Sequence, residues 1–370
     1  MAAIGEILDR LTRQGELYEQ LPDDEVRCYA CGHRCLIRPG KRGICKVRFN
    51  QDGKLYAPWG YVAGIQADPI EKKPFFHLLP GADALTFGML GCDFHCDYCQ
   101  NYLTSQALRD PISDASASFI RRISPEQVAA LAVRSGASVV ASSYNEPLIT
   151  SEWAVAIFRE AIAVGMKCVY VSNGNATPEV LEYLRPYLVG YKVDLKTMQD
   201  RHYRKLGGVL QHVLATIQKA HQLGMWVEVV TLVVPGFNDS SDELLDTARF
   251  IASVSPEIPW HVTAFHPDYR RTDPPPTPAR TLLRAAEIGQ EAGLRYVYAG
   301  NLPGRVNEFE NTVCPQCQKL LIERISFRVL SYHITAEGTC PHCQAHISGV
   351  WTDRPETLRL TGSGFPRRVI

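Results

Sequence analysis

The feature that most constrains the fold is one pattern repeated six times, a short apolar run followed by a segment with helical periodicity. The runs are Ala84–Leu90, Ser138–Tyr144, Lys167–Asn173, Gly190–Lys196, Trp226–Val234 and Trp260–His266. Largely apolar strands are buried on both faces, which is typical of a parallel sheet covered by helices. A seventh run, Arg295–Ala299, is expected to add an edge strand. Six units are too few to close an eight-stranded barrel, so we expect an α/β fold, an open partial (β/α)6 TIM-like barrel.

Local signals mark where several helices begin and end. Ser124-Pro125-Glu126-Gln127 combines a capping residue, a proline at the first helical position and a glutamine that can reach back. Thr177-Pro178-Glu179 repeats the cap and proline before another helix. Glycines 165, 224 and 293 follow helical patterns, as C-terminal caps do. In such folds the active site gathers at the carboxyl ends of the strands, so we expect functional residues there.

The chain of 370 residues is long enough for two or three domains. We expect an N-terminal helix and four-cysteine module at 1–60, the barrel at 61–311, and a C-terminal zinc-ribbon-like module at 312–370. Residues 2–21 suggest an amphipathic helix and not a signal peptide, since acidic residues lie among its apolar ones.

The bulk composition excludes some classes of protein. The 39 basic residues equal the 39 acidic ones, so charge gives no argument for nucleic acid or an anionic membrane surface. No stretch approaches the roughly 18 to 20 apolar residues that span a bilayer. We therefore expect a cytoplasmic protein.

Twelve cysteines are the strongest indication of chemistry. In a reducing cytosol, clustered cysteines usually bind metal or take part in catalysis. Eleven of them form three groups. We name these the N-terminal cysteine group (Cys28, Cys31, Cys35 and Cys45), the central triplet (Cys92, Cys96 and Cys99) and the C-terminal cysteine group (Cys314, Cys317, Cys340 and Cys343). Cys168 stands alone in an apolar run and is expected to be a small core residue.

The central triplet follows the first predicted strand with the spacing C-x3-C-x2-C. Three thiolates can bind three irons of a 4Fe–4S cubane and leave the fourth iron open. S-adenosylmethionine (SAM) needs such an iron, because its amino and carboxylate groups can chelate it. A zinc knuckle is the alternative, although zinc normally takes a fourth protein ligand, for which His95 is the candidate.

The triplet, with aromatic Tyr98 just before its last cysteine, resembles the signature of the radical SAM superfamily. That resemblance implies a barrel of the radical SAM type, a cluster held by the central triplet, and reductive cleavage of SAM to a 5′-deoxyadenosyl radical. It also implies an electron donor of the flavodoxin or ferredoxin type.

Further polar residues close the successive strands where this resemblance predicts SAM contacts. Tyr144-Asn145-Glu146-Pro147 is similar to the motif that binds the SAM amino group, and a carboxylate suits that ammonium. Ser172 and Asn173 could hold ribose hydroxyls. Asp194-Leu195-Lys196 resembles the Asp-x-Lys of pyruvate formate-lyase activating enzymes, with Asp194 for the amine or ribose and Lys196 for the carboxylate. His266 resembles a SAM-contacting histidine of those enzymes.

Each of these residues also has a structural explanation. Glu146 could be a helix cap, Asp194 and Lys196 an ion pair at a strand end, and His266 a loop residue. The fifth strand ends in a further polar turn, Val234-Pro235-Gly236-Phe237-Asn238-Asp239. Five polar clusters that each close a successive strand favour a site.

The two flanking cysteine groups have their own metal chemistry. The C-terminal group consists of two C-P-x-C knuckles separated by strand-like residues, which favours structural zinc over an auxiliary iron–sulfur cluster. The N-terminal group has the spacing C-x2-C-x3-C-x9-C. Four thiolates suffice for zinc, and a second 4Fe–4S cluster that relays electrons is the rival.

The whole chain resembles one radical SAM family, the AmmeMemoRadiSam system enzyme. The matching segments are the N-terminal cysteine group, Asp68–Pro74 with His77, the triplet followed by Gln100-Asn101, Tyr144–Pro147, Tyr296–Asn301, and the terminal cysteine ribbon. This resemblance implies an association with a Memo-like and an Amme-like protein, and it names no substrate. Glu71, Lys72, Lys73 and His77 either line the mouth of the barrel or form a solvated charge run.

Three functions remain open at this point. The first is hydrogen abstraction from an unidentified small substrate. The second is an activase that installs a glycyl radical on a partner enzyme and consumes SAM about once per partner. The third is a zinc-binding scaffold or nucleic-acid-binding protein, against which the neutral charge and intact triplet count.

Overall fold

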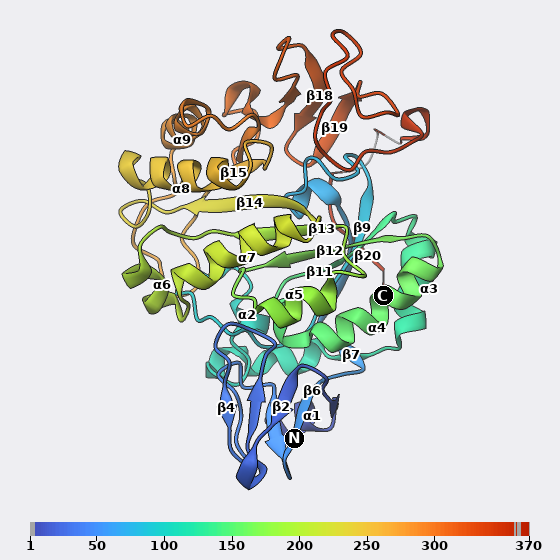
Figure 1. Ribbon diagram of the computed structural model, residues 1–370, viewed down its shortest axis with the longest axis vertical. Coiled ribbons are helices and arrows are strands. Elements are labelled where there is room, and N and C mark those ends of the chain that lie inside the picture. Colours follow the sequence, from blue (N-terminus) through green and yellow to red (C-terminus); the bar gives the residue numbers. More distant parts are fainter. Residues whose placement is uncertain (1–3, 359, 361–363, 370) are drawn as a thin grey trace.

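A computed structural model describes residues 4–358, 360 and 364–369, and its centre is a nine-stranded sheet (Figure 1). Seven of its strands are parallel neighbours. They are β9 (Asp83–Gly88), β11 (Val139–Ser142), β12 (Lys167–Ser172), β13 (Gly190–Asp194), β14 (Trp226–Val233), β15 (Trp260–Ala264) and β16 (Val297–Gly300). The six predicted strands and the seventh edge strand are confirmed, each within a few residues of the expected bounds. The sheet is open, with β16 at one edge.

Helices pack against one face of this sheet and give each strand its crossover (Figure 1). They are α3 (Pro125–Ser135), α4 (Ser151–Ala163), α5 (Pro178–Leu184), α6 (Asp200–Leu206), α7 (Leu210–Gln222), α8 (Ser241–Val254) and α9 (Ala279–Glu291). The predicted capping box at Ser124 is present, and the Thr177 hydroxyl accepts from the Val180 amide at 3.1 Å. Glycines 165, 224 and 293 have the positive φ that a helix end requires.

Two antiparallel strands extend the sheet beyond the predicted set. β8 (Gly64–Pro69) pairs with β9, and β20 (Arg367–Arg368) pairs with β8. The sheet is therefore mixed, and the last described residues of the chain return to its edge. β8 precedes the repeats and β20 is very short, so neither has a periodic signal in the sequence.

The N-terminal module consists of two three-stranded antiparallel sheets at one end of the barrel (Figure 1). Their strands are β1 (Thr12–Gln14), β2 (Tyr18–Gln20), β3 (Val26–Cys28), β4 (Leu36–Ile37), β5 (Phe49–Gln51) and β6 (Lys54–Pro58).

The expected amphipathic helix over residues 2–21 is wrong for most of its length. Helix α1 covers only Ile4–Asp9, and residues 2 and 3 lie outside the described part of the chain. After Asp9 the chain pairs as β1 with β6 and as β2 with β3. Gly15, between those two strands, donates its amide to the Leu55 carbonyl at 2.8 Å. Strand pairing, with the distant β6 for β1 and with the nearby β3 for β2, therefore overrides the local helical pattern.

The segment from Ile70 to Leu79 enters the barrel and closes the amino end of the sheet. Phe75 and Leu78 are fully buried against the first residues of β9, β11 and β12. Glu71, Lys73 and His77 are buried with them, so a solvated charge run is wrong for these three residues.

The C-terminal module lies at the opposite end of the molecule from the N-terminal module (Figure 1). Strands β17 (Thr312–Val313), β18 (Leu320–Ile325) and β19 (Arg328–Tyr332) form its antiparallel sheet. It contacts the barrel through a bridge between Leu78 and Val350 and a hydrogen bond from Arg324 to the Phe76 carbonyl at 2.9 Å. In the described part of the chain, no helix is long and apolar enough to cross a bilayer.

Candidate active site

The central triplet lies on the loop that leaves the carboxyl end of β9. Cys96 is buried, and Cys92 and Cys99 are half-buried. The Phe94 amide donates to the Cys92 sulfur at 3.4 Å, and Ser105 Oγ lies 3.2 Å from the Cys99 sulfur. Hydrogen bonds of this kind surround the thiolates of iron–sulfur clusters.

The spacing of the triplet does not suit a single metal ion. Among the described residues, the three sulfur atoms do not lie within 4.8 Å of one another, as they would around one zinc. A cubane gives each thiolate its own iron, which spreads the sulfurs apart. Burial raises the pKa of Cys96 to about 12 and that of Cys92 well above its usual value. These thiols therefore need a bound cation to ionise, and a cluster supplies one.

His95 does not join the triplet as a fourth ligand. Its amide donates to the Leu206 carbonyl, and its ring lies against Gly207, where there is no side chain to obstruct it. The residue is exposed and lines surface cavities. The zinc alternative thus lacks the fourth ligand that the sequence offered for it.

A buried network that the sequence reasoning missed surrounds Asp93, inside the motif. The Asp93 carboxylate is fully buried and accepts hydrogen bonds from the side-chain amides of Asn173 and Asn175, both at 2.8 Å. Asn173 and Asn175 follow β12, so this network fixes the triplet loop to the end of another strand. Two signals were available in the sequence. One was an acid between two predicted cysteine ligands, and the other was the polar turn that follows β12, two strands away in the sheet.

Glu146 lies at the end of β11, and its hydrogen bonds go to protein groups. It accepts from Ser172 Oγ at 2.8 Å, the Asn173 amide at 2.7 Å and the Leu148 amide at 3.1 Å. Glu146 thus caps η4 (Pro147–Thr150), which is the alternative explanation that the sequence offered for this residue. Burial, and then the Asp93 carboxylate, raise the pKa of Glu146 to about 8. An added ammonium would favour its ionised form.

Asn145, Ser172 and Asn173 are also engaged within the protein. Asn145 Oδ1 accepts from the Met89 amide at 3.0 Å, which joins the ends of β9 and β11. The Ser172 hydroxyl lies 3.1 Å from the hydroxyl of Tyr191 and accepts from the Gly174 amide at 3.0 Å. The structure brings these three residues together with Glu146 as expected. Their hydrogen bonds hold the ends of neighbouring strands in place.

The Asp-x-Lys pair at the end of β13 forms an ion pair that includes a third residue. Lys196 Nζ lies 3.4 Å from Asp194 Oδ2, and Lys192 contacts the other oxygen. Burial would raise the pKa of Asp194, but the two lysines outweigh it and lower that pKa. Burial likewise opposes the charge of Lys196, yet Asp194 and then Cys96 raise its pKa well above the usual value. Lys196 therefore stays a cation beside the triplet.

Two further predicted contacts lie around the triplet. Tyr98 is buried, with its ring edge-on to Phe237 at 6.0 Å and the Arg271 guanidinium 5.5 Å from its centre. His266 is exposed, and its Nε2 lies 3.0 Å from the side-chain nitrogen of Gln100. Gln100 directly follows the last cysteine, so His266 belongs to the rim of the same loop.

Inside the barrel, charged residues form a second group that the sequence reasoning missed in part. Lys73 pairs with Asp68 at 2.6 Å, and its ammonium lies 4.5 Å from the centre of the Tyr144 ring. The Tyr144 hydroxyl donates to Asp68 at 2.8 Å, and the residue has a φ of 72°, which is rare for an aromatic. Lys192 shares its strand face with Asp194, a period-two relation visible in sequence.

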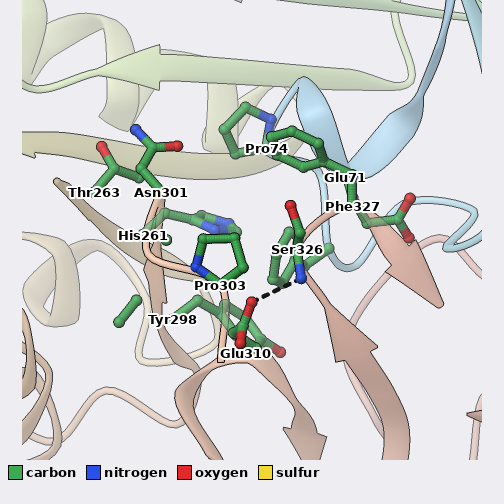
Figure 2. Close-up of a pocket in the computed structure, with 13 residues that line it drawn as sticks. Glu71, Pro74, His261, Thr263, Tyr298, Asn301, Pro303, Glu310, Ser326 and Phe327 are labelled. Carbon is green, nitrogen blue, oxygen red and sulfur yellow. Dashed lines mark hydrogen bonds between the residues drawn. The ribbon is translucent and has the colours of Figure 1, made fainter. Parts of the chain in front are cut away.

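A small cavity lies between the barrel and the C-terminal module (Figure 2). His261, Tyr298, Asn301 and Pro303 line it, and Glu310 accepts from the Ser326 amide at 2.7 Å beside it. Its volume of about 40 Å³ holds only one or a few water molecules. This cavity is too small to receive a substrate in the described conformation.

The C-terminal cysteine group has the geometry of a single-ion site. Its four sulfurs lie within 4.8 Å of one another, and the Cys314–Cys343 and Cys317–Cys340 distances are 3.6 and 3.7 Å. Four thiolates at 2.3 Å from one tetrahedral ion would be about 3.8 Å apart. This group is therefore a metal-binding site, as its spacing predicted.

Comparison with known proteins is consistent with this site. The radical SAM superfamily model matches residues 87–251, which contain the central triplet and strands β11 to β14. The chain is 38% identical over 338 residues to an uncharacterized protein of Methanocaldococcus jannaschii, covering 90% of this chain and 98% of that protein. It is 26% identical over 197 residues to the pyruvate formate-lyase-activating enzyme of Staphylococcus aureus, covering 50% of this chain and 76% of that enzyme. The chain belongs to the radical SAM superfamily and is related to the pyruvate formate-lyase-activating enzymes.

A search of solved structures finds other radical SAM proteins. A radical SAM methyltransferase from Sphaerobacter thermophilus matches with a TM-score of 0.45 at 14% identity, covering 66% of this chain and 71% of that one.

Proposed function

We propose that the central triplet holds a 4Fe–4S cluster and that the enzyme cleaves SAM reductively to a 5′-deoxyadenosyl radical, which abstracts hydrogen from an unidentified substrate. The observation that carries this proposal is the triplet itself: three thiols spread beyond single-ion distance at the end of β9, with the ring of His95 against Gly207. When bound there, the cluster supplies a low-potential electron for cleavage of the sulfonium bond.

The surrounding residues have roles that follow from their contacts. Lys196 remains a cation next to Cys96, so it can pair with the SAM carboxylate while Asp194 keeps it in place. Glu146 has three protein donors and room for one more, so it can accept from the SAM ammonium. Tyr98 and His266 bound the site on the triplet side, and Asn145, Ser172 and Asn173 hold the strand ends that carry Glu146.

The test uses protein purified anaerobically and reconstituted with iron and sulfide. After reduction with dithionite and addition of SAM, 5′-deoxyadenosine is quantified. Cys96→Ala should abolish the product, whereas Cys168→Ala, which alters a buried thiol in β12, should retain it. A reducible cluster that never yields product, even with a partner added, would contradict the proposal. Absence of any cluster would favour the zinc-binding scaffold.

A second candidate is an activase that places a glycyl radical on a partner enzyme. It is supported by the matches to enzymes named as activating enzymes, including the isethionate sulfite-lyase activating enzyme of Oleidesulfovibrio alaskensis at 27% identity. The alignment covers 37% of this chain and 46% of that enzyme. An activase should consume about one SAM per partner chain and produce a glycyl radical signal by EPR. Repeated turnover on a small molecule would exclude it.

Several further assignments belong to the same proposal. We propose zinc in the C-terminal cysteine group, functional units at 1–60, 61–311 and 312–370, and a cytoplasmic location, where free thiols stay reduced. The AmmeMemoRadiSam resemblance adds Memo-like and Amme-like partners and a flavodoxin- or ferredoxin-type donor. Co-purification of tagged protein with the two partners tests the association.

A further inference from the structure

The N-terminal cysteine group gathers four thiols in a small volume without the geometry of a zinc site. Cys28, Cys31 and Cys45 are buried and Cys35 is half-buried. All three other thiols are close enough to Cys31 to raise its pKa, after burial and Asp93. Yet in the described part of the chain no three of the four sulfurs lie within 4.8 Å of one another, in contrast to the C-terminal cysteine group.

This difference in sulfur spacing distinguishes zinc from a 4Fe–4S cluster, the two alternatives that the sequence left open for the N-terminal cysteine group. Around one tetrahedral zinc, sulfur atoms are about 3.8 Å apart, as they are in the C-terminal group. In a 4Fe–4S cubane each thiolate binds a different iron, so the sulfurs stand farther apart. The N-terminal group shares its wider spacing with the central triplet and not with the C-terminal group.

The N-terminal group also sits directly on the loop of the central triplet. Gly91 has a φ of 94°, and a Cβ there would meet Val47 Cγ1 at 2.8 Å and the Cys45 carbonyl at 3.3 Å, so the backbone conformation and the close approach both favour glycine. Gly32, next to Cys31, donates its amide to the Asn175 carbonyl at 2.7 Å. Asn175 in turn donates to the Asp93 carboxylate at 2.8 Å. A single residue thus links the loop of Cys31 to the triplet loop.

Arg109 binds both loops from the outside. Its guanidinium donates to the Phe94 carbonyl at 2.5 Å and also to the Ile44 carbonyl, on the residue before Cys45. This direct contact gives two redox groups a short path, whereas zinc carries no electrons.

The outer side of the N-terminal group opens on a positively charged hollow of about 580 Å³. Half-buried Cys35 lines it together with the cations Arg42, Lys46 and Arg109. Asp9 pairs with Arg42 at 2.6 Å, so the excess positive charge comes from Lys46 and Arg109. Such a surface complements an acidic electron-transfer protein and steers its approach.

We infer that Cys28, Cys31, Cys35 and Cys45 hold a second 4Fe–4S cluster, which relays electrons from an acidic low-potential donor protein at this hollow to the central triplet. One electron leaves the donor, reduces the second cluster by one and then passes on, so the second cluster returns to its starting state and no bond changes. The relay rests on the proposed function of the triplet, whereas the cluster site does not.

Metal content of the full-length protein, reconstituted anaerobically, tests the site without reference to activity. The inference predicts about eight irons, eight sulfides and one zinc per chain, and zinc in the N-terminal group predicts about four irons and two zincs. The second result overturns the inference. Because this count needs only the unaltered chain, a variant that fails to fold does not affect it.

Variants then assign the two clusters. The triple variant Cys92→Ala, Cys96→Ala, Cys99→Ala should keep about four irons, with an EPR signal that SAM does not change. The double variant Cys31→Ser, Cys35→Ser should keep about four irons, with a signal that SAM does change. A triple variant without iron overturns the second cluster. SAM-insensitive iron in the double variant would instead contradict the proposed function.

The relay has its own readout. With reduced ferredoxin as donor, the double variant should form 5′-deoxyadenosine at least about tenfold more slowly than the unaltered enzyme, because the donor must then reach the triplet directly. With dithionite, a small reductant, the loss should stay below about twofold. Equal rates of the variant and the unaltered enzyme with ferredoxin would overturn the relay.

Discussion

The ion pair between Arg48 and Glu152 fixes the N-terminal module to the barrel, and its removal gives the sharpest stability prediction. Arg48 precedes β5, and Glu152 lies in the first turn of α4. Their side chains are 1% and 2% exposed and form two bonds of 2.7 Å. Glu152 also accepts from the backbone amides of Glu16 and Leu17 at 3.1 and 3.3 Å. One carboxylate on α4 therefore binds two separate segments of the N-terminal module.

Glu152→Gln should lower the free energy of unfolding by about 3 to 5 kcal/mol, because it leaves a guanidinium buried without its counter-charge. The matched control is Glu287→Gln on α9, whose partner Arg284 is 3.7 Å away and about half exposed. That exposed pair should contribute less than about 0.5 kcal/mol. Replacing both buried partners, as in Arg48→Met with Glu152→Leu, should recover much of the loss because no unpaired charge remains.

Anaerobic urea denaturation, followed by tryptophan fluorescence, measures this effect. Trp59 of the N-terminal module and Trp153 of α4 meet edge-on at 5.1 Å, so their emission reports this interface. A loss of less than about 1 kcal/mol for Glu152→Gln, or a loss no larger than that of the Glu287→Gln control, would refute this role of the ion pair.

The pH dependence of this ion pair provides a second check. Burial would raise the pKa of Glu152, but Arg48 outweighs it and the pKa is lowered. The stabilisation is therefore fully present above the unfolded value of about 4.3 and is lost as the pH falls through the lower folded value. The difference between the unaltered chain and Glu152→Gln should shrink over that acid range.

Three other predictions concern separate parts of the molecule. Lys196→Met should raise the KM for SAM about tenfold, because a charge-assisted contact with the SAM carboxylate is lost. Lys205→Met, at an exposed residue, should leave the KM unchanged. Equal effects of the two substitutions in a steady-state assay would contradict the proposed role of Lys196. Burial lowers the pKa of His77 to about 4. The folded state therefore resists a proton that the unfolded state accepts below about pH 6.5. As the pH falls from about 6.5 to about 4, the free energy of unfolding should decrease by up to about 1.4 kcal/mol per pH unit. His77→Gln should flatten this slope in urea titrations at pH 7 and 5.5, and an unchanged slope would count against it. Cys317→Ser should remove about one zinc per chain without loss of iron, and elemental analysis showing full zinc would exclude zinc at that site.

The periodic part of the chain was predictable because its signals are local. The six apolar runs became β9 and β11 to β15 with small shifts at their ends, and Ser124 and Thr177 cap helices as their neighbours indicated. The C-terminal cysteine group was equally legible, because the two residues between the cysteines of each knuckle set the approach of their sulfurs. In these places the interacting groups are close in sequence.

Residues far apart in the chain decided the rest. Helix α1 ends at Asp9 because β1 pairs with the distant β6 and β2 pairs with the nearby β3, and this pairing leaves no periodic trace in residues 2–21. Lys73 could be assigned to the barrel interior only once Asp68 and Tyr144 were placed around it.

At the candidate active site, the sequence by itself predicted which residues gather, since strand ends must meet at one edge of a parallel sheet. The tertiary structure decided which contacts each of these residues makes. In the folded chain Glu146 caps η4, Lys192 joins the Asp194–Lys196 ion pair, and the Asp93 carboxylate accepts hydrogen bonds from two asparagines. The fold also sets the N-terminal cysteine group against Gly91. The physical reason is that burial and hydrogen-bond partners depend on segments that only the completed fold brings into contact.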